Sequence, residues 1–140
     1  MPQPMPCLKT YLVEDSAVIR ESLIATLEEL VPVQVVGTAE DEASAVQWLQ
    51  QDGNHADLVI IDIFLKGGSG LGVLRSAKLL THVRKLVVLS NYTTADMRRK
   101  CLALGADRVF DKSNDIEALI QYCARLAEGG NGDTNYAVLA

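Results

Sequence analysis

The stretch Asp57-Leu58-Val59-Ile60-Ile61-Asp62 decides the fold of this sequence. Its four central residues are apolar without a break, a pattern typical of a strand that is buried on both faces. Such strands belong to parallel sheets that helices cover on both sides. The run ends on a carboxylate, Asp62, so the segment predicts a central strand with an acidic group at its carboxyl end.

Outward from this strand, further strand-like and helix-like segments alternate along the chain. Strands are predicted at Leu8–Val13, Val33–Gly37, Lys85–Ser90 and Arg108–Asp111. Helices are predicted between Ser16 and Pro32, over Asp41–Gln51, over Leu71–Leu80, and over residues 94–104 and 113–127. This alternation predicts an α/β fold with a five-stranded, doubly wound parallel sheet.

Local signals mark how several of these helices begin and which side faces the core. Ser16 can cap a helix, and the apolar positions behind it, Ile19, Leu23, Leu27 and Leu30, recur at three- and four-residue spacing. Thr93 with Asp96, and Asn114 with Glu117, have the spacing of capping boxes and predict the starts of two later helices.

Composition limits the classes of protein to consider. The 140 residues, 49% of them hydrophobic, suit one globular domain, and no apolar run approaches a membrane span. A formal net charge of −5 argues against a nucleic-acid-binding surface over the whole domain. Met1–Pro6 lack the features of a signal peptide, and three widely spaced cysteines suit a reducing cytoplasm.

Polar side chains follow the strands at the points where they end. Glu14 and Asp15 follow the first strand, Asp62 ends the third, Ser90 ends the fourth, and Lys112 follows the fifth. Carboxyl ends of parallel strands meet at one edge of the sheet, so these groups are expected to converge there. Clustered carboxylates repel one another unless a cation joins them, and oxygen ligands suit Mg²⁺. A carboxylate beside Mg²⁺ can attack a phosphoryl group, and Asp62 is the natural nucleophile.

These residues, in this order and on these elements, resemble the receiver domain of bacterial two-component response regulators. The segments Leu58–Ile63, Gly70-Leu71 and Gly105–Asp107 add to the resemblance, which covers residues 8–127 and leaves 128–140 as a C-terminal tail. The resemblance implies a flavodoxin-like, CheY-like fold with strand order 2-1-3-4-5.

The resemblance also implies a role for each site residue. Asp62 would accept a phosphoryl group from a histidine kinase or a histidine phosphotransfer protein. Mg²⁺ would be bound by Asp15, Asp62 and the backbone carbonyl of Phe64, with Glu14 acting through metal-bound water. Lys112 would pair with Asp62 and then with the phosphoryl group, and Ser90 would move to hydrogen-bond it. The chain would then catalyse only its own phosphorylation and dephosphorylation.

A downstream protein is the expected reader of this switch. The surface implied comprises the helix over 94–104, the strand over 107–111 and the helix over 113–127, and it allows for a homodimer that forms on phosphorylation. Neither nucleic acid nor membrane is expected to bind this chain directly. Val109 stands where the family usually has an aromatic switch residue, and Phe110 should point to the opposite face. Lys66, followed by two glycines, suggests a flexible loop after Asp62.

Two other functions compete with the phosphorylated switch. A degenerate receiver would act only as an interaction module, but all five site groups are present in the sequence. A Mg²⁺-dependent phosphatase with an aspartate nucleophile would want a second Asp two residues after the first, where this sequence has Phe64.

Overall fold

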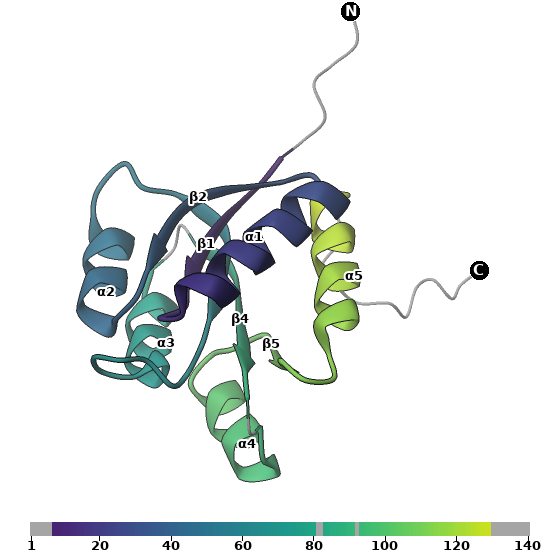
Figure 1. The fold of residues 1–140 in the computed structure, drawn as a ribbon. Helices are drawn as coiled ribbons and strands as arrows, with labels where there is room; N and C mark the ends of the chain where they lie inside the picture. Colours follow the sequence, from purple (N-terminus) through teal and green to yellow (C-terminus); the bar gives the residue numbers. More distant parts are fainter. Residues whose placement is uncertain (1–6, 81–82, 92, 130–140) are drawn as a thin grey trace, which may run out of the picture.

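A computed structural model describes residues 7–80, 83–91 and 93–129 and shows a single parallel sheet of five strands. The strand order is β2-β1-β3-β4-β5, as predicted (Figure 1). The strands are β1 (Leu8–Val13), β2 (Val33–Ala39), β3 (Ala56–Ile61), β4 (Val83–Ser90) and β5 (Arg108–Asp111). The helices are α1 (Ala17–Leu30), α2 (Glu42–Gln50), α3 (Gly70–Lys78), α4 (Ala95–Ala103) and α5 (Ile116–Ala127).

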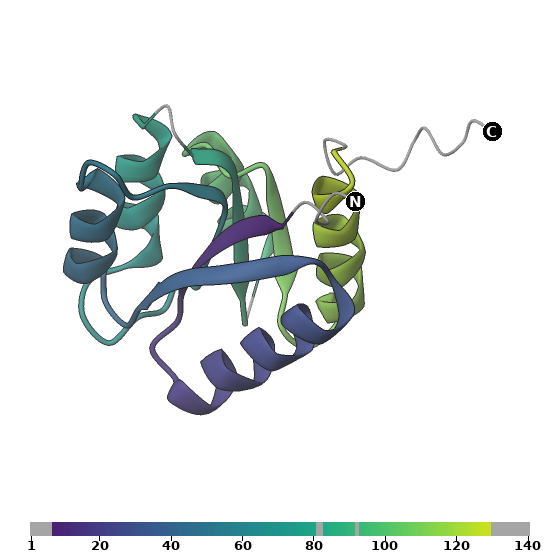
Figure 2. The ribbon, with the colours of Figure 1, turned by 90° about the horizontal axis from the view of Figure 1, so that it is seen from above.

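Helices cover both faces of the sheet, and the core is accordingly double. One apolar cluster joins the sheet to α1 and α5, and the other joins it to α2, α3 and α4. The two helical layers lie on either side of the strands in Figure 2. Within β3, Leu58 and Ile60 enter the first cluster, whereas Val59 and Ile61 enter the second. The unbroken apolar run of the central strand therefore serves two cores at once, as predicted.

The first helix begins where the sequence indicates, but its apolar face is shorter than expected. The Ser16 side chain accepts a hydrogen bond from the Ile19 N–H, and Leu23 and Leu27 are buried. Leu30 is 60% exposed, because it lies at the last turn before the chain leaves the helix for β2. Ile19 is 38% exposed at the other end, so only the two middle positions of the apolar repeat, Leu23 and Leu27, are buried.

Two capping predictions are displaced, and the helices they mark are shorter than the predicted ranges. Thr94, not Thr93, caps α4 by accepting from the Met97 N–H. Asp115, not Asn114, precedes α5, and its side chain makes no capping hydrogen bond to that helix. The helix starts later than residue 113 because the Asp111 carboxylate holds the Ser113 N–H in a turn.

At the sheet edge, Val109 and Phe110 point to opposite faces, as strand alternation predicts. Val109 packs against the cluster formed with α2, α3 and α4. Phe110 is buried in the other cluster, where its ring lies 5.7 Å from that of Tyr122. The aromatic side chain of β5 is thus part of the core and is separated from α4 by the sheet. Among the described residues, no helix is long and apolar enough to span a bilayer.

Candidate functional site

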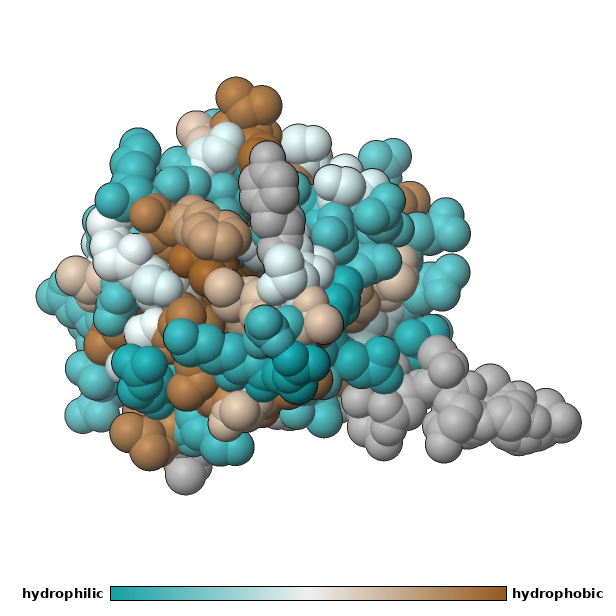
Figure 3. All heavy atoms as spheres, turned by 90° about the horizontal axis from the view of Figure 1, so that it is seen from below, coloured by the Kyte–Doolittle hydropathy of each residue, from teal (hydrophilic) through white to brown (hydrophobic). Residues whose placement is uncertain are grey.

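The candidate site lies at the carboxyl edge of the sheet, where the backbone hydrogen bonding continues one residue past β1, β3 and β5. The Glu14 N–H donates to the Ala39 carbonyl, and the Asp62 N–H donates to the Val13 carbonyl, both at 2.9 Å. The Lys112 N–H donates to the Ser90 carbonyl at 3.0 Å. These bonds fix the backbone from which the side chains project, which explains why separate strand ends converge on one point. Figure 3 views this carboxyl-edge side of the molecule from below.

Three carboxyl groups meet at this edge. One oxygen from each of Glu14, Asp15 and Asp62 lies within 4.8 Å of the others. Glu14 and Asp62 are buried, with 2% and 6% of their surface exposed, and Asp15 is half-buried. Like charges held this closely in a desolvated place favour a cation between them. The donor set consists of oxygens only and therefore fits a hard divalent ion such as Mg²⁺.

Lys112 supplies the positive charge to the acid cluster in this structure. Its ammonium lies 3.0 Å from Asp62 Oδ2 and 2.5 Å from Glu14 Oε1, and its side chain is only 11% exposed. Burial works to lower the pKa of this lysine, but hydrogen bonds and charges of the two carboxylates outweigh it and raise the pKa. The pKa of the Glu14 carboxyl is raised, because the effect of burial is larger than that of the hydrogen bonds from Lys112 and the Ser16 N–H, which lower it.

Both oxygens of Asp62 are held in place. The Ser90 hydroxyl, which is buried, donates to Asp62 Oδ1 at 2.9 Å, and the Phe64 N–H donates to the same oxygen at 3.2 Å. Lys112 donates to Oδ2. The carboxylate is therefore oriented by a hydroxyl, an amide and an ammonium before any reaction.

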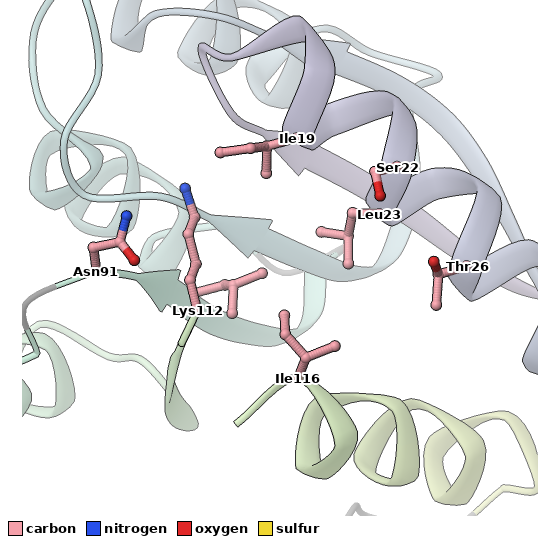
Figure 4. Close-up of a pocket in the computed structure, with 8 residues that line it drawn as sticks. Ile19, Ser22, Leu23, Thr26, Asn91, Lys112 and Ile116 are labelled. Atoms are coloured by element: carbon pink, nitrogen blue, oxygen red, sulfur yellow. The ribbon is translucent and has the colours of Figure 1, made fainter. Parts of the chain in front are cut away.

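The site is open to a reactant. A cavity of about 350 Å³ is lined by the acid cluster together with Ser16, Ile19, Phe64, Asn91 and Lys112. Phe64 is 52% exposed at its rim. A second cavity of about 300 Å³ lies beside the first, between α1 and the start of α5, and it shares Ile19, Asn91 and Lys112 with it (Figure 4).

All the residues predicted for the site are thus near one another. Glu14, Asp15, Asp62, Ser90 and Lys112 are joined by the contacts above, and Phe64 lines the same cavity. Sequence reasoning missed Asn91, which follows Ser90 in a loop and has no periodic signal.

Sequence reasoning also missed a polar network beside Lys112. The Thr93 hydroxyl donates to Asp111 at 2.9 Å, and the Asp111 N–H donates to Asp115. Arg98 donates to the Val109 carbonyl and to Thr93, and its guanidinium lies 3.5 Å from Asp115. Hydrogen bonds from the Ser113 N–H and from Thr93 lower the pKa of Asp111. This network joins the start of α4 to the β5–α5 turn.

Fold and site together define a flavodoxin-like domain with an acid cluster and a buried lysine at the carboxyl edge of its sheet. The family model described as response regulator receiver domain matches residues 10–124. The chain therefore belongs to the response regulator receiver domain family.

Individual relatives agree with this assignment. The chain is 30% identical over 112 residues to the protein-glutamate methylesterase/protein-glutamine glutaminase 1 of Methanospirillum hungatei, which covers 79% of this chain and 32% of the relative. It is 28% identical over 99 residues to the response regulator UvrY of Escherichia coli K12, covering 71% of this chain and 44% of UvrY. The chain thus spans less than half the length of these curated relatives.

A solved structure shows the same fold. A two-component response regulator of the LuxR family from Aurantimonas sp. SI85-9A1 superposes with a TM-score of 0.77 at 22% identity, over 89% of this chain and 87% of that one.

Proposed function

We propose that this chain is the phosphoryl-accepting switch of a two-component phosphorelay and that Asp62 is the acceptor. One observation carries the proposal: both carboxylate oxygens of Asp62 are held by Ser90, Phe64 and Lys112, with two further acids within 4.8 Å. The donor would be a phosphohistidine of a histidine kinase or histidine phosphotransfer protein, because a phosphoimidazole is an activated phosphoryl donor. The cavity above Asp62 gives such a group access.

The proposed reaction is a substitution at phosphorus. A carboxylate oxygen of Asp62 forms a bond to phosphorus while the bond from phosphorus to the donor nitrogen breaks. The imidazole leaves with a proton taken up from water, and Asp62 becomes an acyl phosphate. The Lys112 ammonium and the Ser90 hydroxyl already lie beside the two Asp62 oxygens, so they are positioned to stabilise negative charge on the transferred group.

Mg²⁺ fits the acid cluster. Asp15, Asp62 and the backbone carbonyl of Phe64 would hold the ion. Glu14 would act through a bound water, which is consistent with its two oxygens being engaged by Lys112 and by the Ser16 N–H. When bound, Mg²⁺ offsets the repulsion between the carboxylates and the incoming phosphoryl oxygens.

A small phosphodonor tests the proposal against its competitors. After incubation with acetyl phosphate and Mg²⁺, the wild-type chain should gain the mass of one phosphoryl group, and Asp62→Asn should gain none. Continued turnover of a phosphoester without retained mass would favour the phosphatase. A wild-type chain that gains no mass in Mg²⁺ would favour an interaction module.

The output is proposed to be a protein contact made by α4, β5 and α5. The polar network of Arg98, Thr93 and Asp111 supports this part of the proposal, because it connects the turn that carries Lys112 to α4. A homodimer that forms on phosphorylation would use the same surface. A cytoplasmic location belongs to the proposal too, since the three cysteines of the chain are free thiols and these persist in reducing compartments.

A further inference from the structure

The loop that follows Asp62 is tied to the first residue of α2. The Glu42 N–H donates to the Gly67 carbonyl at 3.0 Å. The Glu42 carboxylate in turn accepts the Ser69 N–H at 2.9 Å. One glutamate therefore holds residues 67 and 69 through its backbone and its side chain. Gly67 and Gly68, from which a flexible loop is predicted, therefore lie in a segment that hydrogen bonds to Glu42 hold against α2.

The glycines of this region leave room for the Glu42 side chain. A Cβ atom at Gly68 would lie 2.5 Å from Glu42 Cβ, and a Cβ atom at Gly72 would overlap the Glu42 carboxylate. Gly72 is buried inside α3, where glycine costs about 1 kcal/mol relative to alanine. The loop after Asp62 and α3 thus pack around the Glu42 carboxylate, and the glycine at position 72 that makes room for it lowers the helix propensity of α3. Figure 1 shows α2 and α3 side by side.

Backbone contacts carry this attachment from Ser69 to the acid cluster. Ser69 and Phe64 face each other as an isolated antiparallel bridge, and the Gly70 N–H donates to the Ile63 carbonyl at 2.9 Å. The Phe64 N–H donates to Asp62 Oδ1. Glu42 is therefore connected to the acceptor carboxylate indirectly, through the backbone of Ser69 and Phe64.

We propose that Glu42 is a positioning residue for the acid site: it fixes the loop after β3 so that the Phe64 backbone stays where it can serve the metal and Asp62. The inference rests on the proposed function, because it concerns the Mg²⁺ that Asp15, Asp62 and the Phe64 carbonyl would hold. Partners of metal ligands orient those ligands, and their removal weakens binding by about 10–100-fold. Glu42 acts one contact further out, so the effect expected is about tenfold, the lower end of that range.

Mn²⁺ is the probe for the test, since it takes the same oxygen ligands as Mg²⁺ and its free form is counted by electron paramagnetic resonance. Glu42→Ala should raise the Mn²⁺ dissociation constant about tenfold and speed hydrogen exchange of the amides at 63–69 in metal-free protein. Glu42→Gln should stay within about twofold of wild type, because its amide oxygen can still accept the Ser69 N–H.

Two further variants separate positioning from general stability. Gly72→Ala should weaken Mn²⁺ binding as Glu42→Ala does, by displacing the carboxylate, although alanine favours the helix. Glu29→Gln removes the same charge from an exposed position on α1 and should leave the dissociation constant unchanged. A purely structural role predicts instead that the free energy of unfolding falls in Glu42→Ala while the Mn²⁺ affinity of the folded chain is kept.

The outcomes are distinguishable. Wild-type binding that Asp15→Asn abolishes and Glu42→Ala leaves unchanged would overturn the role of Glu42 and leave the proposed function standing. A wild-type chain that bound no Mn²⁺ would overturn the proposed metal site and the role of Glu42 with it.

Discussion

At the scale of single residues, the site balances the repulsion among clustered carboxylates against their attraction to one lysine ammonium. Two of the three clustered carboxyl groups contact one buried ammonium, that of Lys112, which lies closer to Glu14 than to Asp62. Lys112 therefore neutralises part of the negative charge of the cluster, and burial raises the pKa of Glu14, the most buried of the three carboxyl groups. Under the proposed function, a divalent ion would take over some of the contacts that Lys112 makes with these carboxylates.

Removing the lysine tests this balance. Lys112→Met keeps the aliphatic stem but leaves the carboxylates uncompensated, and the expected loss is about 3–5 kcal/mol of unfolding free energy without Mg²⁺. Mg²⁺ should restore part of it, because the ion takes over the neutralising role. Urea unfolding with and without Mg²⁺ measures both effects. Lys100→Met, on the exposed face of α4, serves as the control. Equal losses with and without Mg²⁺ would contradict this picture.

At the scale of elements, the β5–α5 turn and the start of α4 form one hydrogen-bonded unit. Asp111 accepts hydrogen bonds from the Thr93 hydroxyl and from the Ser113 N–H. Arg98 donates a hydrogen bond to the carbonyl of Val109. Because Val109 is not aromatic and Phe110 is buried on the other face, no ring on β5 connects this turn to α4. The polar network provides that connection instead.

The lowered pKa of Asp111 gives this unit a pH dependence with a definite sign. A carboxyl whose pKa is lower in the folded chain than in the unfolded chain adds stability at neutral pH, and that stability is lost as pH falls below the ordinary value of 3.8. Asp111→Asn should therefore be less stable than wild type at pH 7 by urea unfolding, and the difference should shrink below about pH 4. A difference that stayed constant across this range would show that the charge of Asp111 contributes nothing.

Sequence reasoning predicted the strand ends well and the loop contacts poorly. Asp62 and Ser90 follow apolar runs that mark strands, and Lys112 follows the short strand Arg108–Asp111. Parallel strands bring their ends together, so the proximity of these residues could be inferred. The contacts of Glu42 and Thr93 depend on how separate loops pack, which leaves no periodic trace in the sequence. The shifted cap of α4 has the same cause, because Thr93 bonds to Asp111 and leaves Thr94 to cap the helix.

At the scale of the whole molecule, each side of the sheet contains one buried cysteine. Cys101 on α4 belongs to the cluster with α2 and α3, and Cys123 on α5 belongs to the cluster with α1. Burial raises the pKa of both thiols, that of Cys123 to about 12. Cys7, by contrast, is exposed. The two buried thiols can therefore report on the two cores separately.

The rates at which the three cysteines are alkylated measure how each core opens. At neutral pH, N-ethylmaleimide should modify Cys7 rapidly, whereas Cys101 and Cys123 should react only as the chain opens, because buried neutral thiols are poor nucleophiles. Peptide mass spectrometry over time distinguishes the sites. Rapid modification of Cys101 alone would mean that the core under α4 opens independently of the other.

The central claim is that Asp62 takes the phosphoryl group, and mapping the modified residue tests it most directly. After incubation with acetyl phosphate and Mg²⁺, peptide-level mass spectrometry should locate one phosphoryl group on the peptide that contains Asp62, labile in alkali as an acyl phosphate is. Omission of Mg²⁺ should abolish the signal. A phosphoryl group on any other residue, or an undiminished signal in Asp62→Asn, would contradict the account.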